Sequence, residues 1–239
     1  ANPSYVEMYT YVIQLGAILA VVVMYWKKLW PLATIEKKPA INKDIFVLWF
    51  KIFTACVPAI IIGLLFDDKI DALFYNYQTV AVTLILYGIL FIVIERRNKH
   101  RVARIDDVSK ITYKTALLIG VFQLLSLIPG TSRSGATILG AILIGTTRTV
   151  AAEFTFYLAV PVMFGASLFK LVKFGFVFSG LEAAVLLTGC AVAFVVSIFA
   201  IKFLVGYIKK HDFEAFGWYR IVLGVAVLGY FTAKAMLKF

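Results

Sequence analysis

The sequence predicts an all-α, polytopic membrane helical bundle. The chain has 239 residues, of which 62% are hydrophobic, whereas a soluble domain is nearer half apolar. Several apolar runs approach or exceed the ~18 residues that are typical of a bilayer span. One bundle accounts for a chain of this length, so we expect a single integral membrane domain over 1–239 and no soluble second domain.

Apolar runs predict six long helices and two short ones. The long segments are expected at about 8–26, 45–66, 79–94, 150–172, 183–208 and 217–237. The short segments, 113–128 and 136–146, are separated by Pro129-Gly130, and proline breaks helices. Each short segment is too short for a comfortable span, so together they predict a re-entrant helix hairpin over 113–146.

Charged residues in the loops predict the orientation of the bundle. Lys and Arg concentrate in loops 27–44, 95–112 and 209–216, whereas loop 67–78 is net acidic. Basic loops face the cytoplasm in most membrane proteins, which places residue 1 outside. The formal charge of +11 is therefore interpreted as a topology signal. We do not expect nucleic acid as a partner, because no aromatic-rich polar surface accompanies the basic residues.

The order of the spans predicts an internal repeat. Three long spans precede the hairpin and three follow it, and an odd number reverses the direction of the chain. The segments 8–94 and 113–237 are then inverted-topology repeats, an arrangement found in many transporters. Symmetry calls for a second hairpin before residue 8, where the sequence has none. We therefore expect that roughly 40 residues of the first repeat are missing at the N-terminus.

The stretch PGTSRSGAT at 129–137 places polar side chains between two apolar segments. Irregular backbone at membrane depth is tolerated where it lines a cavity or is buried in protein, and a charge there indicates function. The fork of Arg133 matches phosphate geometry, and Gly130 and Gly135 let N–H groups approach a ligand closely. The hydroxyl donors are Thr131, Ser132, Ser134 and Thr137. With the positive end of the following helix, these groups predict a site for phosphate; the alternative is a polar kink packed against a neighbouring helix.

The motif contains no Asp, Glu or His, so residues outside it are further candidates. Glu153, the nearest downstream carboxylate, is either a site residue or a partner of Arg148 at the start of its helix. Gln14 and Gln123 are either interhelical hydrogen-bonding residues or site residues. Arg220 lies near a predicted cytoplasmic end and can extend to the interface. Phosphoryl transfer also needs an activated nucleophile or a metal, so the motif alone is half of a hydrolytic site.

Three stretches of the chain resemble bacterial undecaprenyl-diphosphate phosphatases of the bacitracin-resistance type: PGTSRSGAT at 129–137, EFTFYLAVP at 153–161 and VIQLGAILAVVVMYWKKL at 12–29. The resemblance implies hydrolysis of undecaprenyl diphosphate, which recycles the lipid carrier for peptidoglycan. It also implies bacitracin resistance and a multi-pass location in the bacterial cytoplasmic membrane. By this resemblance Arg133 neutralises the transferred phosphate, and Ser132 and Thr137 donate to its oxygens.

The resemblance leaves several alternatives open. The family's other motif, a glutamate-rich stretch before a PVSSTGH-like loop, is not in the sequence. A divalent cation, Mg or Ca, suits a diphosphate, with ligands expected in that absent N-terminal segment; Cys56 and Cys190 lack metal-binding spacing. An inverted-repeat transporter or flippase for an anionic lipid or solute is the alternative function, and an inactive lipid-phosphate binder is a third. The expected partners are a polyprenyl diphosphate and membrane lipids, with a homodimer as a further candidate.

Overall fold

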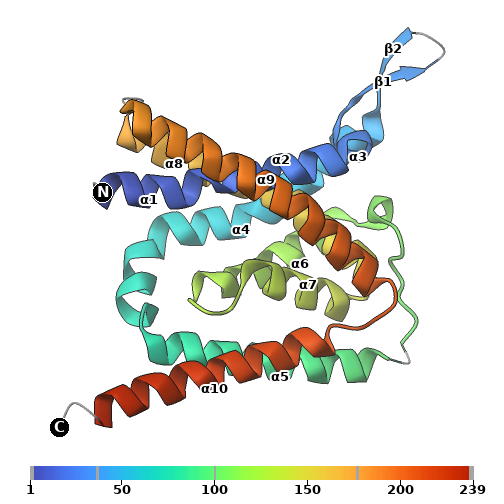
Figure 1. Ribbon diagram of the computed structural model, residues 1–239. Helices are drawn as coiled ribbons and strands as arrows, with labels where there is room; N and C mark the ends of the chain where they lie inside the picture. Colours follow the sequence, from blue (N-terminus) through green and yellow to red (C-terminus); the bar gives the residue numbers. More distant parts are fainter. Residues whose placement is uncertain (1–2, 36–37, 100, 176–177, 237–239) are drawn as a thin grey trace. The chain divides into compact units, whose positions relative to one another are not determined.

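The computed structural model describes residues 3–35, 38–99, 101–175 and 178–236, and these are almost entirely helical (Figure 1). The predicted outward position of residue 1 lies outside the described residues. Six apolar helical segments are long enough to cross a membrane: Ser4–Met24, Lys43–Gly63, Tyr77–Asn98, Arg148–Phe174, Gly180–Ile208 and Glu214–Met236. The six predicted long segments are therefore confirmed to within a few residues at each end, and the chain is a multi-pass membrane protein.

A short β-hairpin departs from the predicted all-α class. Strand β1 (Leu32–Ile35) pairs antiparallel with β2 (Lys38–Ile41) inside the loop expected between the first two spans. Both strands contain β-branched residues, which favour extended backbone. Pro39 is tolerated because each strand of a two-stranded ribbon is an edge strand. The β-hairpin is therefore a short addition to a helical protein, whose fold class stays all-α.

The chain divides into two compact units, each built from segments far apart in the sequence. Unit 1 comprises Ala1–Phe53 and Phe156–Tyr207, and unit 2 comprises Thr54–Thr155 and Ile208–Phe239. Two long helices, α4 (Lys43–Phe74) and α8 (Arg148–Phe174), contribute to both units. These units do not coincide with the segments 8–94 and 113–237, so the inverted repeats and the single membrane domain stay predictions.

Helix α4 is longer than the sequence indicated. The acidic segment expected to be a loop at 67–78 is helical as far as Phe74, beyond the membrane-length part that ends at Gly63. The chain then turns at Asn76, whose side chain accepts a hydrogen bond of 2.8 Å from the Thr79 N–H and caps the next helix. The prediction of a loop was wrong because charge alone does not end a helix, and the sequence has neither proline nor glycine between Gly63 and Asn76.

In unit 1 the N-terminal helices pack against α9 (Gly180–Ile208). The N-terminal segment consists of α1 (Pro3–Val12), α2 (Gln14–Met24) and α3 (Trp26–Leu29). Gly16 makes this packing close, since a Cβ added there would lie 2.1 Å from the Cys190 carbonyl oxygen. A second contact uses Ala20 and Val21, which are buried with Ile201. Small residues thus let two apolar helices approach closely.

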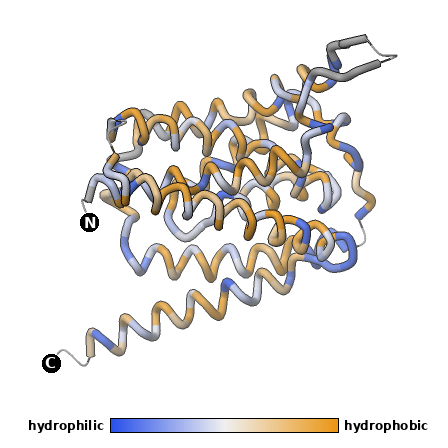
Figure 2. Tube along the Cα trace, turned by 45° about the horizontal axis from the view of Figure 1, so that its top comes forward, coloured by the Kyte–Doolittle hydropathy of each residue, from blue (hydrophilic) through white to orange (hydrophobic). Residues whose placement is uncertain are grey.

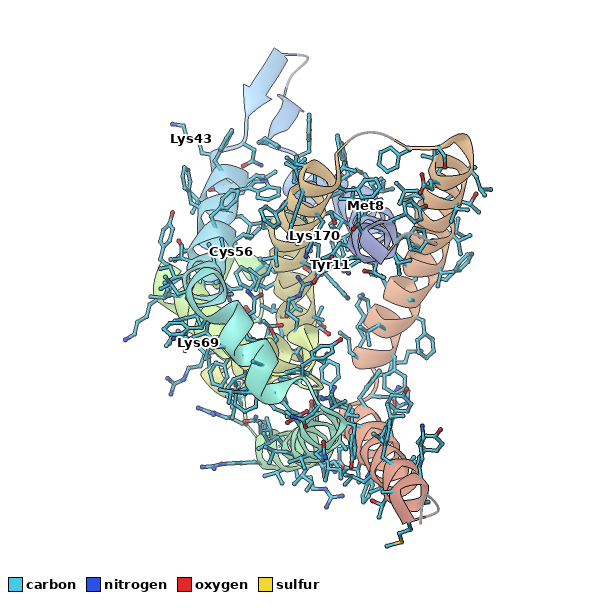
Figure 3. The ribbon with its side chains drawn as sticks, turned by 90° about the vertical axis from the view of Figure 1, so that its left-hand side faces the viewer. Met8, Tyr11, Lys43, Cys56, Lys69 and Lys170 are labelled. Atoms are coloured by element: carbon cyan, nitrogen blue, oxygen red, sulfur yellow. The ribbon has the colours of Figure 1, made fainter. Side chains whose placement is uncertain are left out.

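Unit 1 also contains an ion pair between distant segments. Lys170 of α8 pairs with Glu7 of α1 and lies 4.9 Å from the centre of the Tyr11 ring (Figure 3). Ser167, one turn earlier on α8, donates a hydrogen bond of 2.7 Å to the Tyr11 carbonyl oxygen. These polar contacts fix the end of α8 against the N-terminal helices.

In unit 2, α5 (Tyr77–Asn98) and α10 (Glu214–Met236) lie side by side (Figure 1). A Cβ added to Gly88 of α5 would lie 2.7 Å from the Gly217 carbonyl oxygen of α10, so the backbones are in near contact. Figure 2 shows hydrophobic positions along both helices and hydrophilic ones where α5 ends and α10 begins. Glycines at a helix interface allow this close approach in membranes.

The predicted hairpin is present as two short helices in unit 2. Helix α6 (Tyr113–Gln123) continues into a 3-10 turn, η2 (Leu124–Leu127), and α7 (Arg133–Ile144) follows the break. The 12 residues of α7 span about 18 Å, less than the ~30 Å of a hydrocarbon core. Phe122 packs on Gly140, so the helices are in contact. The hairpin is confirmed as a helix pair; its re-entrant placement stays a prediction.

Candidate phosphate-binding site

Residues 129–137, called the polar break below, have a strained backbone. Gly130 has a φ of +86°, and Ser132, with a φ of 69°, is the one non-glycine residue with positive φ in the part of the chain that the structure describes. Such a conformation costs about 1–3 kcal/mol and clusters at functional sites. A Cβ on Gly130 would lie 2.2 Å from Thr83 Oγ1 and 2.7 Å from the Val80 carbonyl oxygen. Only glycine fits there, so α5 determines how the chain enters the break.

Two helices hold the polar break by its carbonyl groups. Thr83 Oγ1 of α5 lies 2.7 Å from the Pro129 carbonyl oxygen. Arg220 Nη2 of α10 donates to the carbonyl oxygens of Gly130 and Thr131, at 2.6 and 3.0 Å. The explanation of Arg220 as a side chain that extends to the interface was therefore wrong. Its signal in the sequence was a charge inside an apolar segment, which in a membrane helix indicates function.

The accessible part of the polar break is formed by Ser132, Arg133 and Ser134. The two serines are exposed and Arg133 is half-buried. Ser132 Oγ caps α7 by accepting a hydrogen bond of 3.3 Å from the Gly135 N–H, and it lies 3.3 Å from Ser134 Oγ. Among the residues that the structure describes, the Arg133 side chain has no ion-pair or hydrogen-bond partner. A cation without a counter-ion at the positive end of a helix favours an anionic ligand.

The two threonines of the polar break are fully buried. Thr137 Oγ1 lies 3.0 Å from the Arg133 carbonyl oxygen and accepts a hydrogen bond of 3.0 Å from Thr155 Oγ1 of α8. Thr131 Oγ1 has no hydrogen-bond partner among the described residues. In this structure Thr137 therefore stabilises the packing of α7, and its role in binding diphosphate stays a prediction. The predicted residues that lie together in the break are Gly130, Thr131, Ser132, Arg133, Ser134, Gly135 and Thr137.

Glu153 lies on α8 and is half-buried. Arg148, the alternative partner predicted for Glu153, binds another carboxylate instead. Arg148 donates to the Glu95 carboxylate of α5, from Nε at 2.9 Å and from Nη2 at 2.5 Å. Glu95 is almost completely buried and was not among the predicted site residues. Its signal in the sequence was its place: a lone carboxylate directly after an apolar segment and directly before a run of basic residues.

The two glutamines have different surroundings. Gln14 lies in unit 1, where its amide nitrogen donates to the Thr10 carbonyl oxygen at 3.1 Å, so its hydrogen bond is local. Gln123 lies at the end of α6 in unit 2, and it is buried. Both polar atoms of its side chain lack partners within the described residues. Because an unpaired buried polar group costs about 1–3 kcal/mol, Gln123 remains a candidate site residue.

The described residues do not fit a divalent cation. Among them there is no group of three or more His, Cys, Asp or Glu that could hold a metal ion. The polar break offers hydroxyls and a guanidinium, whereas Mg and Ca bind carboxylate and carbonyl oxygens. The divalent cation stays a prediction.

Comparison with known proteins decides the family. The family described as bacitracin resistance protein BacA matches residues 1–226. The chain belongs to the BacA family. It is 64% identical over 232 residues to the undecaprenyl-diphosphatase of Acetivibrio thermocellus, covering 97% of this chain and 85% of the relative. It is 60% identical over 237 residues to that of Desulfitobacterium hafniense, covering 99% and 85%.

A third BacA-type relative is the undecaprenyl-diphosphatase of Enterococcus faecalis, which is 62% identical over 228 residues. This match covers 95% of the chain and 83% of the relative. The family predicted from the three sequence stretches is thereby confirmed. The polar break lies inside the matched region, so the site and the family assignment concern the same part of the chain.

Proposed function

We propose that this BacA-family chain hydrolyses undecaprenyl diphosphate to undecaprenyl phosphate and phosphate in the bacterial cytoplasmic membrane. The reaction recycles the lipid carrier for cell-wall synthesis, and the family's description connects it with bacitracin resistance. The observation that carries the proposal is the half-buried Arg133, which has no counter-ion in the described residues and is flanked by the exposed Ser132 and Ser134. The relatives' name, undecaprenyl-diphosphatase, supports the substrate.

The polar break acts mainly by stabilising charge. The terminal phosphoryl group passes to water: a bond forms from phosphorus to the water oxygen, the bond to the bridging oxygen breaks, and a proton of the attacking water passes to bulk water. Undecaprenyl phosphate leaves with the electron pair. Negative charge is spread over the oxygens of the transferred group, where Arg133 binds two of them and Ser132 and Ser134 donate hydrogen bonds. Donors fixed in advance stabilise this charge better than water, which must reorganise.

Arg220 acts as a positioning residue. Because it binds the Thr131 carbonyl oxygen, the planar trans peptide directs the Ser132 N–H to the opposite side. The strained Ser132 backbone is thereby held with its N–H turned away from Arg220. The start of α7 then adds its own N–H groups, which have no carbonyl one turn earlier to bind. Both effects provide backbone N–H donors for an anion at the polar break.

The isoprenoid tail requires apolar surface, and the helices of unit 2 supply it. Val82, Leu86 and Ile89 of α5 are exposed apolar side chains at helical spacing. In a membrane this surface contacts lipid, so a polyprenyl tail can remain in the bilayer while the headgroup reaches the polar break. A homodimer stays a prediction that this arrangement does not require.

Phosphate release distinguishes the phosphatase from a transporter or flippase of anionic lipids. The purified chain is incubated with farnesyl diphosphate, a soluble short-chain substrate, and released phosphate is measured against Arg133→Lys. Arg97→Lys is the matched control, because Arg97 is an exposed arginine of α5 outside the break. We expect release by the unmodified chain and by the control alone. Transbilayer movement of intact lipid diphosphate without phosphate release would instead support the transporter.

A further inference from the structure

A polar cavity lies at the opposite end of α7 from the polar break. Its volume is about 330 Å³. Residues at the end of α5, at the end of α7 and at the start of α8 line it, together with Ile208 and Lys209. We call it the basic cavity. All of its lining residues belong to unit 2. The 12 residues of α7 separate it from the polar break by about 18 Å, so one phosphate cannot occupy both.

The accessible charge of the basic cavity is positive. Its lining cations are Lys99, Arg101, Arg148 and Lys209, against the single carboxylate of Glu95. That carboxylate is already neutralised, since Arg148 binds it through Nε and Nη2. The Glu95 side chain is 1% exposed and that of Arg148 is 37% exposed, so a ligand meets the cation and not the carboxylate.

Other carboxylates close to the cavity are engaged in their own contacts. Glu214 pairs with Arg96 at 3.2 Å, and Asp106 pairs with Lys110 at 2.6 Å. The hydrogen bond with Lys110 lowers the pKa of Asp106 and raises the pKa of Lys110, so both remain charged at neutral pH. Asp212 also acts electrostatically on Arg148. None of these three carboxylates lines the cavity.

Two unpaired donors face the basic cavity. Thr146 is 4% exposed and its Oγ1 has no hydrogen-bond partner in the described part of the chain. The same holds for the buried Nδ2 of Asn98, and both residues line the cavity. A buried donor left unpaired costs about 1–3 kcal/mol, so an acceptor from outside the protein is expected here. Thr147 and Thr149 show that the positive end of α8 also faces the cavity.

Backbone hydrogen bonds hold the walls of the basic cavity in place. The N–H groups of Arg104 and Ile105 donate to the Gly145 carbonyl oxygen, at 2.9 and 3.1 Å. The Thr147 N–H donates to the Ile105 carbonyl oxygen at 2.9 Å. Loop 95–112 is therefore hydrogen-bonded to the turn between α7 and α8. A site fixed in this way needs little reorganisation to bind an anion.

We propose that the basic cavity binds a phosphate group, either as free inorganic phosphate or as the headgroup of an anionic lipid. The volume lies at the lower end of the range for ligand pockets. Four lining cations, one hydroxyl and one amide donor suit the oxygens of a phosphate. Basic pockets between membrane helices bind lipid headgroups on the cytoplasmic side, where loop 95–112 is predicted to lie.

Thermal unfolding of the full chain in detergent tests binding with inorganic phosphate as the probe, against chloride at equal ionic strength. Lys209→Gln removes a lining charge, and Lys210→Gln is the matched control, because Lys210 is adjacent and does not line the cavity. Thr146→Val removes only the buried hydroxyl. We expect phosphate to raise the Tm of the unmodified chain and the control. Apparent affinity should fall about tenfold in Lys209→Gln and several-fold in Thr146→Val.

A lipid arm distinguishes the two sources. Phosphatidylcholine vesicles with and without phosphatidic acid replace inorganic phosphate, and binding of the same variants is compared. An effect of phosphatidic acid alone, weakened by Lys209→Gln, identifies a lipid headgroup, whereas an effect of inorganic phosphate identifies the free anion. Equal responses of Lys209→Gln and Lys210→Gln to both probes would overturn the proposal. Turnover of farnesyl diphosphate by each variant confirms that it is folded.

Discussion

One arginine lies at the start of α7 and another lies four residues beyond its end, and the two have opposite surroundings. At its start, Arg133 has no counter-ion among the described residues, while the side chains beside it are exposed hydroxyls. Just beyond its end, Arg148 is bound through two nitrogens by the buried Glu95. A buried pair that is already satisfied stabilises one fold, whereas an unpaired guanidinium can bind an incoming anion with little rearrangement. In this protein the partners of an arginine, more than its position, indicate its task.

Arg220 adds a third arrangement to this comparison. Its partners are the carbonyl oxygens of Gly130 and Thr131, so its charge supports the backbone of the polar break. Arg148 therefore binds a carboxylate and Arg220 binds backbone carbonyl groups, whereas the partner proposed for Arg133 is the ligand. Substitutions that alter one partner at a time can separate these tasks.

The largest expected effect is on turnover, from Arg133→Lys. A lysine is a point charge and cannot bind two phosphate oxygens as a planar fork does. Each lost charge-assisted hydrogen bond is worth about 1.5–3 kcal/mol, so kcat should fall on the order of a hundredfold or more. Phosphate release from farnesyl diphosphate measures the rate, and Tm should hardly change. Near-normal turnover would mean that Arg133 is structural and that the two ends of α7 do not differ as described.

Glu95→Gln should have its effect on stability instead. The substitution leaves Arg148 without its buried counter-ion, which costs about 2–3 kcal/mol of unfolding free energy, below the full cost of breaking a buried pair because Arg148 is 37% exposed. Glu214→Gln is the matched control, since its partner Arg96 is 63% exposed and such a pair contributes ~0–1 kcal/mol. Denaturant unfolding in detergent compares the two. Equal losses of unfolding free energy in the two variants would contradict a structural role for the Glu95–Arg148 pair. A loss of kcat in Glu95→Gln alone would contradict it as well.

Arg220→Lys should lower turnover about tenfold. A shorter side chain with one nitrogen loses at least one of the two carbonyl hydrogen bonds, and each is worth ~1.5 kcal/mol or more. Because Arg220 acts through the backbone of the polar break, kcat should fall while KM for farnesyl diphosphate changes little. A rise in KM at constant kcat would place Arg220 in direct contact with the substrate.

The sequence predicted the long helices because a bilayer requires each spanning segment to satisfy its own backbone hydrogen bonds over a fixed apolar length. It identified the polar break because a charge interrupts that pattern. Contacts between residues far apart in the sequence could not be predicted. Arg220 binds Gly130 at a separation of 90 positions, and Arg148 binds Glu95 at a separation of 53. A single sequence contains no signal for such pairs until the helices are packed, and the β-hairpin depends on pairing in the same way.

The smallest expected effect comes from Thr137→Val. Family resemblance gives Thr137 a part in holding the diphosphate, yet its hydroxyl is buried and engaged by the Arg133 carbonyl oxygen and by Thr155 Oγ1. If that engagement persists during the reaction, valine costs about 1 kcal/mol of stability and changes kcat less than tenfold. Thr155→Val is the matched control, because it removes the same hydroxyl pair and leaves the Thr137 hydroxyl on its carbonyl. Similar stability and turnover in both variants would make Thr137 a packing residue. A much larger loss of kcat in Thr137→Val alone would show that its hydroxyl leaves Thr155 for the phosphate, and that the start of α7 rearranges when substrate binds.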